Sequence, residues 1–183
     1  MAPPSDASNP SPSTPSENSP LGNAGGSAVP GATSASAEPT PSPLKYQAPS
    51  NWTFRGAGSF RLATFEIEKD SEKGEVTVSS ARNNLAENAA MWQTQVDPEA
   101  TEEIRQASIA QSLSEVESVK FEKGDGQLIL FRKGTDDNST AILIAVIPTE
   151  SPEESLFVKL KGNLKLAKSE RQSLIDFATS IRW

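Results

Sequence analysis

The sequence contains neither histidine nor cysteine, and these two absences remove much of the chemistry that enzymes commonly use. Without cysteine there is no disulfide, no thiolate nucleophile and no sulfur ligand for structural zinc. Without histidine neither the usual Ser-His-Asp triad nor most catalytic zinc sites can be built. Missing cysteine fits any redox compartment, so it does not locate the protein. We therefore expect a protein that is not an enzyme and that carries no cofactor and no metal.

The chain also has no excess of basic residues and no long apolar run. Lys and Arg number 17 against 24 Asp and Glu, which gives a formal net charge of −7. Phosphate binding depends on an excess of Lys and Arg, so nucleic acid is not an expected partner. The longest apolar run, 141–147, is far shorter than the ~20 residues of a membrane-spanning helix. No transmembrane segment is predicted.

Residue types are distributed unevenly along the chain. Ten of the fourteen prolines lie between Pro3 and Pro43, a stretch without aromatic residues, Lys or Arg. Such a segment cannot bury enough apolar surface to offset about 1–2 kcal/mol of backbone entropy per ordered residue. The sequence therefore predicts a disordered Pro/Ser/Ala-rich tether over 1–45 and a single domain over 46–183.

Within this domain, period-two alternation and short apolar runs predict about six strands. Lys73-Gly74 is the expected turn of the first hairpin, and the continuously apolar run 141–147 indicates a central strand covered on both faces. The predicted strands cover 59–68, 75–79, 116–122, 127–132, 141–147 and 156–160.

Three helices are predicted from sequence periodicity and capping signals. An apolar stripe with a period near 3.6 indicates the first, over 83–96. Asp97-Pro98 is typical of an N-cap with a first-turn proline and opens the second, which ends near Gln111. Ser169-Glu170-Arg171-Gln172 matches a capping box that opens the third. Neighbouring strands are joined by short turns, so the fold class is α+β, an antiparallel sheet of about six strands with helices packed on its faces.

Several segments together resemble a group of bacterial envelope proteins described as lipoproteins. Asn51-Trp52 is followed by Arg-Leu-Ala-Thr-Phe-Glu-Ile from Arg61, Gly-Glu-Val-Thr-Val from Gly74 and Asn-Ala-Ala-Met-Trp-Gln-Thr-Gln-Val from Asn88. In that group an R-x-A-x-F strand precedes G-E-V-x-V and a helix that ends N-x-x-R-W-x-x-Q; here Met91 stands in place of the Arg. More distantly, the order of elements is similar to the PsbP-like fold, an α/β/α sandwich shared by an extrinsic photosystem subunit and a Ran-binding nuclear import factor.

The resemblance implies a location and a type of partner. It implies export to the periplasm, or tethering to the outer membrane, of a Gram-negative-type bacterium. It further implies that a signal sequence and a lipidated Cys would stand directly before Ala2, in the place that Met1 occupies here. Proteins of this fold mostly bind other proteins, so the implied partner is another envelope protein. We expect the chain to be a monomer. Fold analogy alone is a weak argument for function.

Four residues are candidates for a binding site: Arg61, Asn88, Trp92 and Gln95. An aromatic side chain flanked by amides is typical of protein interfaces. Trp92 also lies on the apolar stripe of its helix, however, which favours a place in the core. Arg61 could instead form a cross-strand ion pair with Glu75 or Glu66.

One enzymatic alternative stays open, a histidine-independent hydrolase that uses Asp/Glu or Ser/Lys. Nothing in the spacing of the 24 acids singles out a catalytic pair. A cleft holding two carboxyls about 5–10 Å apart, one of them with a strongly raised pKa, would support this alternative.

Overall fold

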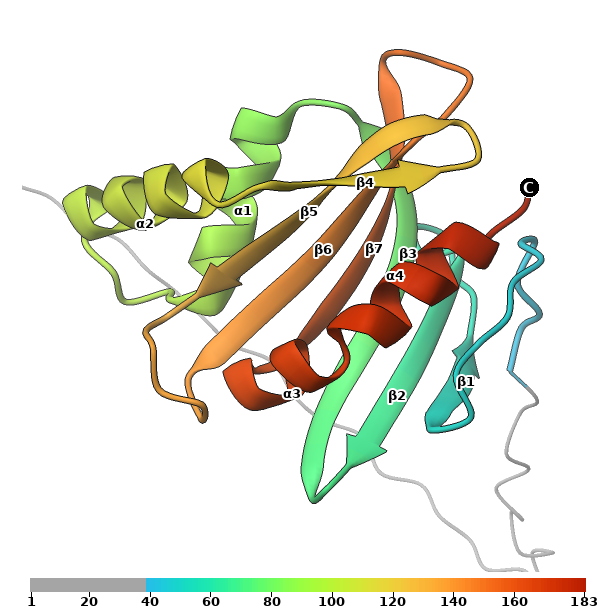
Figure 1. Ribbon diagram of the computed structural model, residues 1–183, viewed down its shortest axis with the longest axis horizontal. Coiled ribbons are helices and arrows are strands. Elements are labelled where there is room, and N and C mark those ends of the chain that lie inside the picture. Colours follow the sequence, from blue (N-terminus) through green and yellow to red (C-terminus); the bar gives the residue numbers. More distant parts are fainter. Residues whose placement is uncertain (1–38) are drawn as a thin grey trace, which may run out of the picture. The chain divides into compact units, whose positions relative to one another are not determined.

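The computed structural model describes residues 39–183, and within them seven strands form one antiparallel sheet (Figure 1). The order of the strands across the sheet is β1-β2-β3-β7-β6-β5-β4. The predicted α+β class and antiparallel sheet are confirmed, with seven strands in place of six. The strands are β1 (Trp52–Gly56), β2 (Ala63–Lys69), β3 (Glu72–Arg82), β4 (Glu117–Phe121), β5 (Gly124–Arg132), β6 (Thr140–Pro148) and β7 (Glu154–Asn163).

The strand that the sequence did not predict is β1, at one edge of the sheet. It has five residues and pairs with β2 so that Trp52 lies opposite Ile67 and Phe54 opposite Phe65. A segment this short, ending at Gly56, offers too little alternation to be recognised by its period. Its aromatic side chains pack in the core, with the ring centroids of Trp52 and Phe65 5.8 Å apart.

The β2–β3 hairpin turns earlier than predicted. Asp70 and Ser71 connect the two strands and both have positive φ, 50° and 70°, as a two-residue type I′ turn requires. The predicted turn at Lys73-Gly74 is therefore wrong, because both residues lie within β3. Gly74 is needed for close packing: a Cβ there would lie 2.6 Å from Leu166 Cδ2.

Four helices complete the described part of the chain, and two of the predicted starts are wrong. Asp97 caps the C-terminus of α1, and α2 begins after Thr101, whose hydroxyl accepts a hydrogen bond from the backbone N–H of Ile104. Glu170 makes no side-chain capping hydrogen bond to α4, and Ser169 ends a separate short helix that was not predicted. The helices are α1 (Leu85–Val96), α2 (Glu102–Ser114), α3 (Leu164–Ser169) and α4 (Arg171–Ser180).

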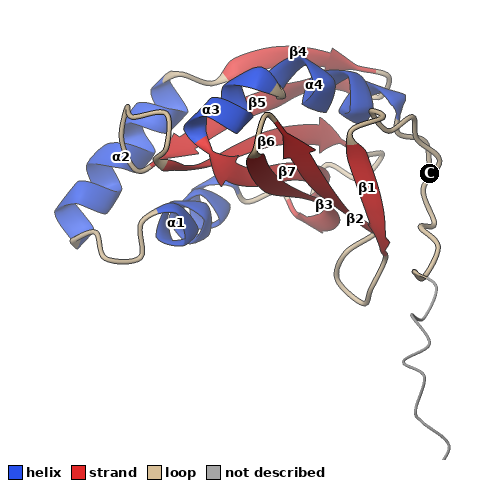
Figure 2. Cartoon of the chain, turned by 90° about the horizontal axis from the view of Figure 1, so that it is seen from below, coloured by secondary structure: helices blue, strands red, loops and turns tan. Residues whose placement is uncertain are grey.

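Buried side chains form two apolar clusters. The larger includes Phe65 of β2 together with Leu174 and Phe177 of α4. The smaller joins Trp92 of α1 to Phe131 of β5. Figure 2 shows α3 and α4 on one side of the sheet and α1 on the other. Strand β6 contributes to both clusters and is buried from Ala141 to Ile147, as expected for a central strand.

The first 38 residues of the predicted tether lie outside the described residues. The segment that follows contacts the domain before residue 46: Leu44 is 8% exposed and belongs to the larger cluster. Lys45 exchanges two backbone hydrogen bonds with Arg182, of 2.9 and 2.8 Å. The Ala57 N–H donates to the carbonyl oxygen of Thr40. The packed part of the chain therefore begins ahead of the predicted boundary.

Candidate functional site

One half of a sheet face is covered by helices and the other half is not. On the face that carries Trp92, α1 packs on β5 and β6 and α2 on β5. Within residues 39–183 no helix packs on the same face of β1, β2 and β3, and Figure 2 shows α1 lying away from β1 and β2. We call this half the uncovered face; its side chains are those of Thr53, Arg55, Thr64, Glu66, Glu68, Lys73, Glu75, Thr77, Lys159 and Lys161.

The register of the strands explains why these residues share a face. Glu75 of β3 lies opposite Glu66 of β2 on one side and opposite Lys161 of β7 on the other. Thr77, two residues on, lies between Thr64 and Lys159. Directly paired residues of antiparallel strands point to the same side of the sheet, so polar residues in three strands form continuous rows.

Three ion pairs cross this face, and all of them are exposed to water. Arg55 pairs with Glu66 at 2.6 Å, Lys73 with Glu68 at 3.8 Å, and Arg61 with Glu75 at 3.2 Å. Exposed pairs of this kind each contribute less than about 1 kcal/mol to stability. A partner could therefore rearrange them at small cost to the fold.

Lys159 lies where the uncovered face meets α1. Its Nζ donates to Oε1 of Gln95 at 3.1 Å. Burial lowers the pKa of Lys159, and the nearby charges of Arg61 and Lys161 lower it further, against an opposing effect of Glu75. Within residues 39–183 neither Lys159 nor Lys161 forms an ion pair. This corner is therefore positively charged and already holds amide and hydroxyl groups.

The face contains two open depressions. One has a volume of about 650 Å³, and its lining includes Thr53, Arg55, Glu66 and Lys73. The other, about 430 Å³, lies under the loop 56–61 that leads into β2.

Phe60 projects from this loop. Four large apolar side chains are exposed within residues 39–183, and Phe60 is the most exposed at 91%, ahead of Ile104 at 54%, Met91 and Trp183. Trp183 already has Lys123 Nζ 5.2 Å from its ring centroid. Phe60 directly precedes Arg61, so it stands at the border of the uncovered face.

Two of the four predicted binding residues meet on the uncovered face. Arg61 reaches it through the predicted ion pair with Glu75, but Arg61 lies in the loop before β2, so the pair joins that loop to β3 and is not a cross-strand pair. Gln95 reaches it from α1 through Lys159. Lys161 and Phe60 were missed as site residues. The alternation in β7 does place Lys159 and Lys161 together, but the lack of a covering helix is a tertiary property that no local pattern shows.

The other two predicted residues have structural contacts. Trp92 is 3% exposed, with its ring centroid 5.7 Å from that of Phe131 and 5.5 Å from that of Phe157. Its ring therefore lies in the core and offers no surface to a partner. The Asn88 side-chain amide donates to the carbonyl oxygen of Arg82 at 3.2 Å. This bond ties the start of α1 to the end of β3.

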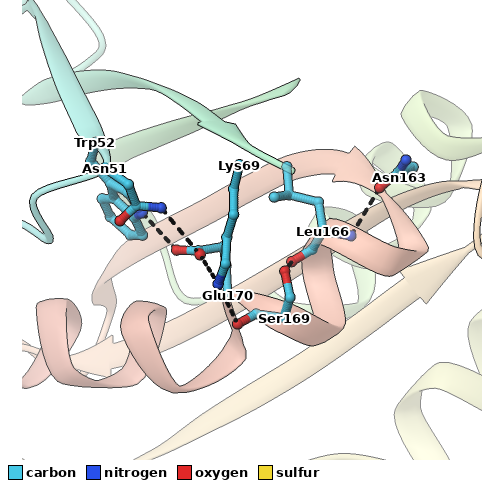
Figure 3. Close-up of polar contacts among 7 residues, drawn as sticks. All are labelled: Asn51, Trp52, Lys69, Asn163, Leu166, Ser169 and Glu170. Atoms are coloured by element: carbon cyan, nitrogen blue, oxygen red, sulfur yellow. Dashed lines mark hydrogen bonds and ion pairs between the residues drawn. The ribbon is translucent and has the colours of Figure 1, made fainter. Parts of the chain in front are cut away.

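A buried carboxylate, that of Glu170, was also missed as a site residue; it lies at the start of α4, and Figure 3 shows its contacts. Its side chain is 1% exposed and accepts hydrogen bonds from Lys69 Nζ at 2.7 Å, Trp52 Nε1 at 2.9 Å and Asn51 Nδ2 at 3.2 Å. Burial by itself raises the pKa of Glu170, but these donors and the charge of Lys69 outweigh it and the pKa is lowered. With three donors in place, Glu170 joins the α3–α4 junction to β1 and β2.

The carboxyl groups of the described residues bear on whether catalysis or metal binding is supported. No group of three or more carboxyl side chains within residues 39–183 is placed to hold a metal ion. Every described carboxyl whose pKa departs from its ordinary value has it lowered, and none has it raised; these are Glu72, Glu102, Asp137, Glu150 and Glu170. None of the described helices is both long enough and apolar enough to cross a bilayer.

Comparisons with known proteins give no family and a likeness in structure. No protein-family model matches the chain, and no curated protein matches it. A crystal structure from Bacteroides thetaiotaomicron is similar with a TM-score of 0.40 and 13% sequence identity, over 76% of this chain and 44% of that one. The similar region thus spans less than half of the Bacteroides protein.

Proposed function

We propose that this chain is a non-enzymatic binding or assembly module that recognises another protein through the uncovered face and the loop that carries Phe60. The observation that carries the proposal is a half-face without a covering helix, rich in weak ion pairs and bordered by the most exposed aromatic side chain of the described residues. Protein interfaces commonly combine an aromatic anchor with a polar surround that excludes water.

The position of Phe60 supports the anchor role. Exposure of a single apolar residue is ordinary, but this one stands above a depression of about 430 Å³ and beside Arg61. Aromatic and arginine side chains are the residue types that most often dominate binding energy. The backbone hydrogen bond from the Gly58 N–H to the Arg61 carbonyl oxygen, 2.7 Å long, narrows the conformations open to this loop. Less entropy is then lost when a partner binds.

For the setting, we propose a cell-envelope protein held by the N-terminal segment, exported to the periplasm or the outer membrane and acting as a monomer on another envelope protein. The resemblance to envelope lipoproteins supports this setting. For the fold we propose the PsbP-like α/β/α sandwich, which the position of α1 opposite α3 and α4 supports (Figure 2). No observation favours the hydrolase alternative.

Site-specific photo-cross-linking tests the proposed surface. The full chain, with p-benzoylphenylalanine in place of Phe60, is irradiated in envelope extract from the source organism. The matched control carries the same group in place of Ile104, an exposed apolar residue of α2 outside the uncovered face. We expect one discrete cross-linked product from position 60 and none from position 104. No product at 60, or the same products at both positions, would refute the proposed surface.

A further inference from the structure

The uncovered face has a charge opposite to that of the whole protein. Counting Arg61 with it, the face carries five bases and three acids, a net charge of +2, whereas the chain carries −7. At physiological salt the Debye length is about 8 Å, so a partner in contact experiences mainly the charges nearest to it. The local excess of bases therefore decides which groups are attracted.

The acids of the face are already paired, but two of its bases are not. Glu66, Glu68 and Glu75 each form an ion pair with an arginine or a lysine. Lys159 and Lys161 form none within residues 39–183. An incoming carboxylate would gain two ammonium groups without breaking an existing pair. An incoming base would have to displace a resident arginine or lysine.

The two lysines are held in position by the sheet. They occupy alternate places in β7, which is hydrogen-bonded to β3 on one side and β6 on the other. Gln95 holds the Lys159 ammonium at 3.1 Å, and the neighbouring Thr77 is buried. The backbone of both lysines and the ammonium group of Lys159 are therefore in place before a ligand arrives, which reduces the entropy lost on binding.

From this arrangement we infer that the uncovered face binds an acidic segment of the partner protein, with a carboxylate of that segment on Lys161 and Lys159 and a second near Arg61. The inference rests on the proposed function and specifies the chemistry of the partner. The exposed Phe60 beside Arg61 then contacts an apolar residue next to the acids.

A peptide-binding measurement tests the acidic preference. The probe is a fluorescein-labelled octapeptide of alternating Glu and Ala, compared with the same peptide carrying Gln for Glu. Binding to the full chain is followed by anisotropy at physiological salt, where distant charges are screened. We expect binding of the Glu peptide only, weakened roughly fivefold by Lys161→Glu. Equal binding of the Gln peptide, or no binding of the Glu peptide, would overturn the inference.

A matched variant separates a local effect from net charge. Lys120 is an exposed lysine of the edge strand β4 and forms no ion pair within residues 39–183, so Lys120→Glu makes the same charge change away from the face. It should weaken binding less than about twofold; equal losses in both variants would refute the local site.

Circular dichroism checks that Lys161→Glu is folded, and Lys161→Gln provides a milder variant. The cross-linking experiment at position 60 does not depend on the charge of the partner. If cross-linking succeeds but the Glu peptide is not preferred, only the acidic preference fails; if cross-linking fails, the proposed protein interface fails.

Discussion

Glu170→Gln is the substitution whose effect the structure defines best. The wild-type carboxylate lies in the protein interior and accepts hydrogen bonds from Lys69, Trp52 and Asn51 (Figure 3). Glutamine has nearly the same shape, but it is neutral and has one acceptor oxygen in place of two. The substitution therefore removes charge and acceptor capacity while leaving the packing volume almost unchanged.

The expected loss follows from the three donors. The Lys69 ion pair contributes at most about 1 kcal/mol, because the lysine is partly exposed to water. The Trp52 bond changes from charge-assisted to neutral, a loss of about 1 kcal/mol. The single remaining acceptor cannot serve all the donors, so the Asn51 amide loses its bond, for about another 1 kcal/mol. The total is about 3 kcal/mol in the free energy of unfolding at pH 7.

The lowered pKa of Glu170 determines how the difference in stability between wild type and variant changes with pH. The folded-state pKa of Glu170 is lowered, so its contribution is fully present above the unfolded-state pKa, about 4.3, and is lost as the pH falls through the folded-state value. Below that value wild-type Glu170 is protonated and resembles glutamine. The gap in stability between wild type and Glu170→Gln should therefore be constant between pH 5 and 7 and should narrow as the pH falls through the lowered folded-state pKa of Glu170.

Urea unfolding followed by far-ultraviolet circular dichroism, at several pH values, measures the gap. Glu66→Gln is the control: it removes a carboxylate from an exposed ion pair and should cost less than about 0.5 kcal/mol. A Glu170→Gln variant as stable as wild type at pH 7 would refute the reasoning, as would a gap that stays unchanged down to the lowest pH.

Two further substitutions test the packing. Gly126→Ala should destabilise the domain by roughly 3 kcal/mol, because the added Cβ would lie 2.6 Å from Phe121 Cε2 and collide with the carbonyl oxygen of Val146. Thermal unfolding measures the effect. The control is Gly58→Ala, where a Cβ meets no atom within 4 Å. Leu44→Ala should cost about 2 kcal/mol, because Leu44 packs in the larger apolar cluster; a loss below about 0.5 kcal/mol in urea would show that the segment before residue 46 adds nothing to the domain.

The sheet could be predicted from the sequence where its strands alternate or run apolar, and not elsewhere. The run 141–147 identified the central strand because burial on both faces leaves a continuous apolar run. The edge strand β1 and the short helix α3 were missed, since neither is long enough to show a period.

The predicted capping box does not form, because Ser169 and Glu170 hydrogen-bond to other partners and not to the first turn of α4. The Ser169 hydroxyl donates to the Leu166 carbonyl oxygen within α3, and the Glu170 carboxylate turns toward Trp52 and Lys69. A buried tryptophan N–H and an ammonium group are stronger reasons for its orientation than a backbone N–H that water can reach. Local motifs hold only where no such long-range partner competes.

The candidate site was only half predictable for a related reason. Alternation along β7 shows that Lys159 and Lys161 share a face. The register of the β2–β3 hairpin places Glu66 opposite Glu75, whereas Arg61 reaches Glu75 from the loop before β2. Whether a helix covers that face depends on where the chain travels after β3. Here Arg82 ends the strand and α1 packs on β5 and β6, so the helix covers the half of the face that carries apolar residues.

The sheet face that carries Trp92 is divided into an apolar half, which α1 covers, and a charged half, which no helix within residues 39–183 covers. In β7 the side chain of Phe157 lies under α1 whereas Lys159 and Lys161 lie beyond it, so the change from apolar to charged residues falls at the edge of the helix. Lys159 and Lys161 raise the local charge without forming ion pairs within residues 39–183, and the acidic partner segment that we propose would supply the carboxylates that these two lysines lack.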